Sequence, residues 1–139
     1  MVTLRSANMF HAYGFLAKVF EILAKHKISV DLITTSEISV SLTLDQTDTS
    51  GGAPELPEAA RLELEELCSV DIEHDLCLVA LIGNNMSESK GYAKQVFGTL
   101  EDFNLRMICY GASPHNLCFL LDESVSKLAI QKLHQELFE

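Results

Sequence analysis

The chain contains an internal repeat, because displacing the sequence by 77 positions brings similar residues into a long register without a gap. Such self-similarity indicates that one structural unit is built twice. Most of the matched positions are apolar, so the repeat indicates a shared fold first and a shared function second. The matched pairs are Asn8-Met9 with Asn85-Met86, Gly14 with Gly91, Val19-Phe20 with Val96-Phe97, Leu23 with Leu100, Ile28 with Leu105, Val30 with Met107, Ser36 with Ser113, Val40 with Leu117, and Leu42 with Phe119.

Hydrophobic periodicity in the first unit predicts four strands and two helices. Apolar residues alternate with polar ones in the expected strands and recur at helical spacing in the expected helices. The first helix is expected to bury Leu16, Val19, Phe20 and Leu23 and to expose Lys18, Glu21 and Lys25, and the second to bury Leu56, Ala60, Leu64 and Leu67. The expected strands are residues 2–7, 28–32, 38–44 and 70–73, and a turn-rich stretch covers residues 45–57.

The order strand, helix, strand, strand, helix, strand is typical of the ferredoxin-like α+β fold, in which both helices cover one face of an antiparallel sheet. The second unit repeats this order, but the chain stops at Glu139 before a fourth strand. A three-stranded sheet leaves an unpaired edge that native proteins normally cover. We therefore expect a fragment with two modules, 1–75 and 76–139, whose missing strand comes from a segment upstream of Met1 in a longer parent or from a neighbouring chain. The second-unit elements are expected at residues 76–82, 91–101, 105–110, 116–121 and 124–137.

Composition excludes several classes of partner. With 47% hydrophobic residues, the 139-residue chain can bury a core. Ten basic and 20 acidic residues give a net charge of −10 without a basic cluster, which argues against nucleic acid and anionic membranes. The longest apolar run, residues 76–82, is far shorter than the roughly 20 residues that span a bilayer. No signal-like segment opens the chain, so the expected location is the cytoplasm.

The sequence shows no motif of a free-standing enzyme. It contains no phosphate-binding P-loop, no Gly-x-Gly-x-x-Gly turn and no Gly-x-Ser-x-Gly elbow. The four cysteines lack the spacing of a zinc site and are expected to be reduced core residues, and the five scattered histidines are expected on the surface or in loops. We therefore predict no catalytic residue, no metal ligand and no cofactor for this chain. These residues are Cys68, Cys77, Cys109 and Cys118, and His11, His26, His74, His115 and His134.

Residues 8–16, with the sequence Asn-Met-Phe-His-Ala-Tyr-Gly-Phe-Leu, connect the first expected strand to the first helix. Free N–H groups at a helix start carry partial positive charge and suit a carboxylate, and Gly14 allows the main chain to approach a ligand closely. An ordinary turn with a flexible glycine explains the same residues equally well. The sequence leaves both interpretations open.

Asp31 interrupts the second expected strand with a full negative charge that could hold an ammonium group. Residues 34–37, Thr-Thr-Ser-Glu, then offer closely spaced hydroxyls, although the pattern favours a simple polar hairpin. A helix start for a carboxylate and Asp31 for an ammonium together predict a cradle for a free amino acid, and the acidic surplus favours a basic one. The second unit carries Ile108 in place of Asp31 and Ala112 in place of Thr35, so only the first unit is expected to bind ligand.

The chain resembles the ACT-domain regulatory region of lysine-sensitive aspartate kinases over essentially all of its length. The residues that carry the resemblance are 8–11, 14–17, 28–37, 106–113 and 115–120. The resemblance implies a parent enzyme that phosphorylates the side-chain carboxylate of L-aspartate, using ATP and Mg²⁺ in an N-terminal kinase domain absent from this chain. It also implies feedback inhibition by L-lysine in lysine, threonine and methionine biosynthesis, a homodimer formed through ACT modules, and a strand preceding the first module that completes the second.

In similar proteins lysine lies between the first ACT modules of two subunits. The resemblance therefore implies that module 1–75 binds the effector and that module 76–139 serves structure and assembly. Ala12 departs from the pattern, because a small hydroxyl residue is expected there, and the loss of one hydrogen bond costs about 0.5–1.5 kcal/mol. The implied effector-binding residues are Met9, Gly14, Phe15, Leu16, Ser29, Val30, Asp31, Thr35 and Ser36.

Two other functions compete with this interpretation. One is a free-standing ACT protein that binds another amino acid, such as threonine or a branched-chain residue. The other is a small ferredoxin-like enzyme of the acylphosphatase type, in which the turn at residues 8–16 would hold a phosphate. That chemistry calls for an arginine at the turn, and these residues contain none.

Overall fold

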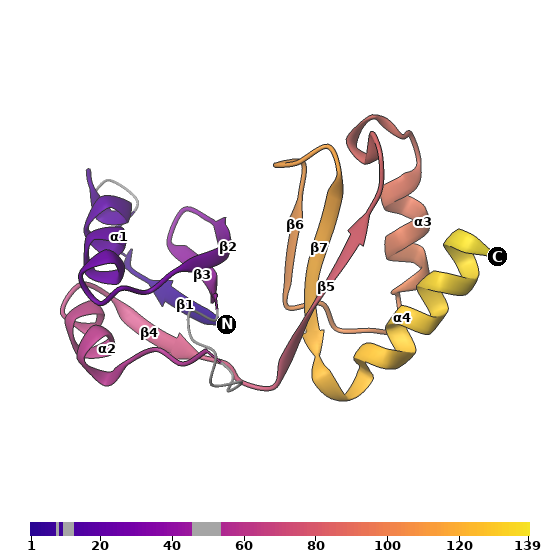
Figure 1. The fold of residues 1–139 in the computed structure, drawn as a ribbon. Coiled ribbons are helices and arrows are strands. Elements are labelled where there is room, and N and C mark those ends of the chain that lie inside the picture. The colour runs from indigo at the N-terminus through magenta and orange to yellow at the C-terminus, as the bar shows by residue number, and fades with distance from the viewer. Residues whose placement is uncertain (8, 10–12, 46–53) are drawn as a thin grey trace. The chain divides into compact units, whose positions relative to one another are not determined.

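The sequence repeat appears in the structure as two separate antiparallel sheets, each with its own pair of helices (Figure 1). The computed structural model describes residues 1–7, 9, 13–45 and 54–139. The chain divides into two units, Met1–His74 and Asp75–Glu139, which are described one at a time below.

The first unit has the predicted ferredoxin-like arrangement. Its sheet has the strand order β2-β3-β1-β4 with antiparallel neighbours, and α1 and α2 lie beside each other on the same face. This order is the one that the split arrangement produces, so the predicted fold class is confirmed. The elements are β1 (Val2–Arg5), α1 (Phe15–Lys25), β2 (Val30–Thr35), β3 (Ser39–Leu44), α2 (Glu58–Glu65) and β4 (Ser69–Ile72).

The second unit repeats this arrangement without a strand equivalent to β4. Its sheet has the order β5-β7-β6, so within the described residues β5 has a partner on one side only. In the first unit the equivalent strand, β1, lies between β3 and β4. The elements are β5 (Leu76–Ile82), the 3₁₀ turn η2 (Met86–Glu88), α3 (Tyr92–Thr99), β6 (Met107–Tyr110), β7 (Asn116–Asp122) and α4 (Glu123–Phe138).

Each unit has a core between its sheet and its helices. In the first unit the sheet contributes mainly β1 and β3, the two central strands, and α1 contributes Val19 and Leu23. In the second unit the largest fully buried side chain is Phe119 on the central strand β7. Of the cysteines, Cys118 is buried and the other three are half-buried, and none of the four forms a disulfide.

Two details of the helix predictions are wrong. Leu16 and Phe20 were expected in the core but are 38% and 39% exposed, because the sheet and α2 cover only the stripe of α1 that carries Val19 and Leu23. The second helix is shorter than its apolar pattern suggests. Pro57 stands at its N-cap, where its ring suits a helix start, so Leu56 lies before the helix, and Leu67 lies beyond its end.

The second strand covers residues 30–35 instead of the expected 28–32, and its register shifts between Val30 and Ile33. Burial still alternates as predicted, because Ile28, Val30 and Leu32 are half-buried while Ser29 and Asp31 are exposed. The shift brings Ile33, instead of Leu32, opposite Leu42. The N–H of Leu32 donates to Oγ1 of Thr43 at 2.9 Å. A bulge of this kind bends a strand and redirects its side chains.

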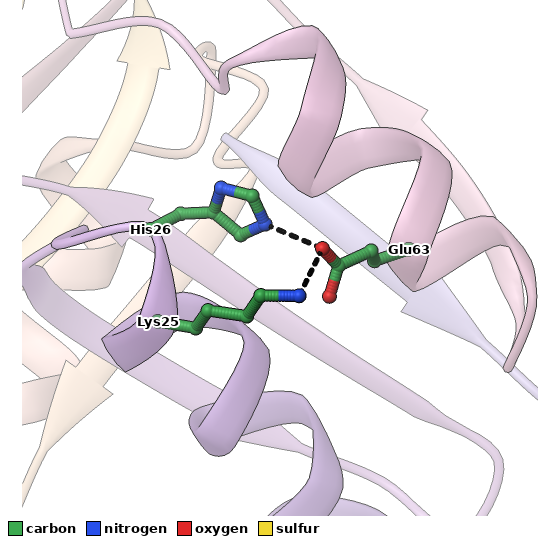
Figure 2. Close-up of polar contacts among 3 residues, drawn as sticks. All are labelled: Lys25, His26 and Glu63. Carbon is green, nitrogen blue, oxygen red and sulfur yellow. Dashed lines mark hydrogen bonds and ion pairs between the residues drawn. The ribbon is translucent and has the colours of Figure 1, made fainter.

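A three-residue polar cluster connects the end of α1 to α2 (Figure 2). Oε1 of Glu63 lies 2.7 Å from Nζ of Lys25 and 2.9 Å from Nε2 of His26. Hydrogen bonds from Lys25 and His26 hold the pKa of Glu63 below its ordinary value. The cluster thus ties α1, the helix that follows the candidate binding segment, to its neighbour.

We expect this cluster to make the first unit sensitive to acid. A carboxyl group with a lowered folded-state pKa stabilises the fold above the ordinary pKa of 4.5, and this contribution is lost as the pH falls through the folded-state value. The melting temperature of the Glu63→Gln variant should therefore fall less than that of the parent chain on acidification. Circular dichroism from neutral pH down to about pH 3 would measure the difference, and parallel curves for the two proteins would contradict the prediction.

Candidate functional site

The segment before α1 leads into the helix start that the sequence singles out. Gly14 occupies the N-cap position with φ +81°, a left-handed conformation that favours glycine. No side chain of the described residues caps the helix, and the first-turn N–H groups of an α-helix have no partner within the helix. Residues 8 and 10–12, including the departure at Ala12, lie outside the described residues.

The predicted site residues around this helix start differ in exposure. Gly14 is exposed, and Leu16 is partly open to solvent. Met9 and Phe15 are half-buried and pack against the core of the first unit. The N–H of Met9 donates to the carbonyl of Ser6 at 3.1 Å, so the segment turns back on itself directly after β1.

Asp31 lies in the irregular part of β2, between the two positions where the register shifts. Its side chain is exposed, as is that of Ser29, whose carbonyl accepts a hydrogen bond from the Asp45 N–H at 2.9 Å. Val30 is half-buried and packs partly against the core. Bulges often lie next to binding sites, and Asp31 lies within such an irregular stretch.

Thr35 and Ser36 lie at the other end of β2, where the chain turns into β3. Thr35 is exposed and pairs opposite Val40. The hydroxyl of Ser36 lies 2.6 Å from that of Ser39 and accepts a hydrogen bond from the Ser39 N–H at 3.2 Å. The polar hairpin that the pattern favoured is therefore present, and it already engages the Ser36 hydroxyl.

One chain does not bring the two halves of the predicted cradle together. Strand β2 follows α1 in the chain, so it begins near the end of the helix. The hydrogen bond from the N–H of Ile28 to the carbonyl of Leu23 holds the chain before β2 against the last turn of α1. Helix α1 has 11 residues, which corresponds to about 16 Å between its ends. The start of α1 and Asp31 therefore lie at opposite ends of the first unit, whereas Thr35 and Ser36 lie at the same end as the helix start.

The structure also reveals a surface that sequence reasoning missed. Four large apolar side chains of the first unit, on α1, on β2 and in the hairpin after β2, are 38–51% exposed. Helix α1 has more apolar residues than one buried stripe requires, and this excess is the signal that could have identified the surface. The four residues are Leu16, Phe20, Ile33 and Ile38, and they are called the α1–β2 surface below.

Neither a metal site nor a membrane span is found in the described part of the chain. Its His, Cys, Asp and Glu side chains form no group of three or more that could hold a metal ion. None of its helices combines the length and the apolar character that crossing a bilayer requires.

Comparison with known proteins gives consistent matches. The family model of the ACT domain matches residues 2–57 and 79–137. Lysine-sensitive aspartokinase 3 of Escherichia coli (strain K12) is 59% identical over 140 residues, which cover 100% of this chain and 31% of that protein.

Two crystal structures of E. coli aspartokinase III match over 99% of this chain and 31% of theirs. The complex with aspartate and ADP, in the R-state, aligns with a TM-score of 0.91 at 59% identity. The complex with lysine and aspartate, in the T-state, aligns with a TM-score of 0.84 at 57% identity. The chain therefore spans less than a third of the length of these relatives.

Proposed function

Because the chain belongs to the ACT-domain family and corresponds to the regulatory part of an aspartokinase, we propose that it senses L-lysine and restrains a kinase domain when lysine binds. The observation that carries the proposal is the 59% identity, over the whole chain, to an enzyme named for its sensitivity to lysine. The crystal structure of that enzyme with lysine and aspartate, in a T-state, supports the same effector.

The geometry of the first unit supports a site shared between two subunits. The amide-rich start of α1 suits the carboxylate of an amino acid, and Asp31 suits an ammonium. These groups lie at opposite ends of the first unit, so one lysine reaches both only if a second chain supplies one of them. A two-fold axis that places the helix start of one chain beside Asp31 of its partner creates two identical sites.

The α1–β2 surface supports such a homodimer. Leu16 and Phe20 lie one helical turn apart on α1, and Ile33 lies on β2, the strand at the edge of the sheet. Contiguous exposed apolar side chains are typical of interaction sites, and the proposed dimer would cover these residues together. Leu16 belongs both to this surface and to the predicted lysine site, which couples dimer formation to effector binding.

The proposed role in the longer protein is feedback control. Lysine binding to module 1–75 would stabilise an inhibited arrangement, and the coupling needs only about 1–3 kcal/mol. The kinase domain, which lies outside this chain, would phosphorylate L-aspartate with ATP and Mg²⁺ in the cytoplasm. Module 76–139 would serve assembly.

One edge of β5 pairs with no strand among the described residues, and this edge supports that assembly role. An apolar groove of ≈ 270 Å³ runs between β5 and α4, lined by Leu78, Ile130 and Phe138 among others. These three side chains are 39%, 47% and 68% exposed. We propose that a strand from outside this chain pairs with β5 and covers the groove. Amide hydrogen exchange in the longer protein tests this, because unprotected β5 amides there would contradict it.

A pair of glycine variants tests the lysine site, because Gly14 and Gly91 occupy equivalent positions. Their φ angles are +81° and +84°, and among the described residues that are not adjacent in the chain, none places an atom within 4 Å of an added Cβ. Replacing either residue with alanine costs about 1–2 kcal/mol of stability through backbone strain. Only Gly14→Ala should also weaken lysine binding, measured by titration calorimetry.

Equal effects of both glycine variants on lysine affinity would contradict the assignment of the site to the first unit. Parallel titrations with threonine and the branched-chain amino acids identify the effector. Tighter binding of one of these would replace lysine in the proposal while retaining the site.

A further inference from the structure

Two of the four cysteines lie directly opposite each other on neighbouring strands. Cys109 on β6 pairs with Cys118 on β7 in the register of the second sheet. Directly opposed residues of antiparallel strands point to the same face of the sheet, and their Cα atoms lie about 4.5–5.5 Å apart. Disulfides join residues whose Cα atoms are about 4.4–6.8 Å apart. The backbone therefore places these two thiols within the range of a disulfide, although both are reduced in this structure.

The hydrogen bonds of the sheet determine which kind of pair the two cysteines form. At one end of β5 the N–H of Gly83 donates to the carbonyl of His115, and at the other end the N–H of Glu123 donates to the carbonyl of Asp75. Odd-numbered residues of β7 therefore bond to β5, and even-numbered residues, including Cys118, bond to β6.

A disulfide at this hydrogen-bonded pair is expected to be strained. The Cβ atoms of directly opposed residues lie about 4.5–5.5 Å apart, nearer the upper value in hydrogen-bonded pairs, whereas a disulfide needs about 3.5–4.5 Å. Closing the bond therefore draws the two strands together locally. A strained disulfide is reduced more easily than a relaxed one, so reduced thiols should reverse this bond.

The pair lies on the face of the second sheet that its helices do not cover. Leu117 and Phe119, the neighbours of Cys118 in β7, belong to the core between the sheet and the helices. Because side chains alternate along a strand, Cys118 and Cys109 point to the other face. Cys118 is 6% exposed, whereas Cys109 is half-buried. An oxidant therefore reaches Cys109 first, and Cys118 is placed to react with the product.

The first unit carries hydroxyl groups at the corresponding place. Ser41 is related to Cys118 by the 77-residue repeat, and Thr34 lies opposite Ser41 in the first sheet. The Ser41 hydroxyl lies 2.9 Å from the Thr3 hydroxyl, within hydrogen-bonding distance. Hydroxyl groups form no disulfide, so thiol chemistry at this place is confined to the second unit.

We infer that Cys109 and Cys118 form a redox-responsive site, which a disulfide oxidant such as glutathione disulfide converts reversibly into a cross-strand disulfide. The thiolate of Cys109 attacks one sulfur of glutathione disulfide, whose S–S bond breaks and releases one glutathione thiolate. The thiolate of Cys118 then attacks the Cys109 sulfur and releases the second glutathione. The two cysteines lose two electrons and two protons, which the two glutathione molecules take up. The inference is independent of the proposed function, because it concerns only the second sheet.

The test equilibrates the folded chain with glutathione disulfide, alkylates the remaining thiols and maps the disulfides by peptide mass. Cys68 and Cys77 provide a matched pair in the same chain, because they are also nine positions apart but lie in different units. Loops of equal length close with equal probability in an unfolded chain, so both disulfides should form about equally in concentrated urea. In the folded chain the Cys109–Cys118 disulfide should exceed the Cys68–Cys77 disulfide at least about tenfold, and reduced glutathione should remove it.

Serine variants identify the roles of the two thiols. Cys118→Ser should leave Cys109 as a mixed disulfide with glutathione, because no thiol then lies opposite Cys109 to release the glutathione. The control, Cys77→Ser, should leave the yield of the Cys109–Cys118 disulfide unchanged. A folded parent chain in which both thiols remain fully alkylated, or in which the two disulfides form equally as in urea, would overturn the inference. This result needs no variant, so it decides even if Cys118→Ser does not fold.

Discussion

Replacing Asp31 with asparagine is expected to weaken lysine binding roughly ten- to a hundredfold. The carboxylate is the group proposed to hold an ammonium of the ligand, and a hydrogen bond to a charged group is worth about 1.5–3 kcal/mol. Asp31 is exposed in the irregular part of β2, so the variant should fold as well as the parent. Titration calorimetry with lysine measures the change in affinity.

The matched control is Glu66→Gln, which removes the same charge from an exposed residue at the end of α2. A general electrostatic effect of the surplus acidic residues would weaken binding equally in both variants. An unchanged affinity in Asp31→Asn would reject Asp31 as a ligand-binding residue.

Mixed dimers make the test of Asp31 sharper. We propose that each site combines Asp31 of one chain with the helix start of the other. A mixed dimer of one Asp31→Asn chain and one Gly14→Ala chain then has two different sites. One site carries both changes, and the other site carries neither. Mixing the two variants in equal amounts should restore parent affinity at about a quarter of the sites. No restoration after subunit exchange would show that each site lies within one chain.

Replacing Phe20 with aspartate is expected to separate the proposed dimer into monomers. No lysine binding should then be detected even at millimolar lysine. Phe20 is 39% exposed on the α1–β2 surface, and burial of an unpaired carboxylate in an interface costs several kcal/mol. Sedimentation velocity should show monomers, and calorimetry should show no lysine signal.

Leu62→Asp provides the control for this change. Leu62 is 55% exposed on α2, in the same unit but outside the α1–β2 surface. The control variant should retain both the dimer and its lysine affinity. A monomeric Phe20→Asp chain that still binds lysine at parent affinity would contradict a site shared between subunits.

The sequence alone determined the architecture of both units. Its 77-residue repeat and its alternating apolar positions are local signals, because strand and helix periods are properties of neighbouring residues. The central core residues Val19, Leu23, Val40 and Leu42 followed from these periods and are buried. The absence of a β4 equivalent in the second unit also followed from the order of elements.

Only the tertiary structure decided how the candidate site is arranged. The burial of an apolar residue depends on which stripe of a helix the sheet covers, so the exposure of Leu16 and Phe20 could not be read from spacing. The separation of Asp31 from the helix start, at the other end of the first unit, could not be read either, because the direction of β2 and its shifted register come from pairing with β3. The hydrogen bond from the Tyr110 hydroxyl to the Met86 carbonyl joins residues 24 positions apart. Such a contact forms only when strands and turns have packed together.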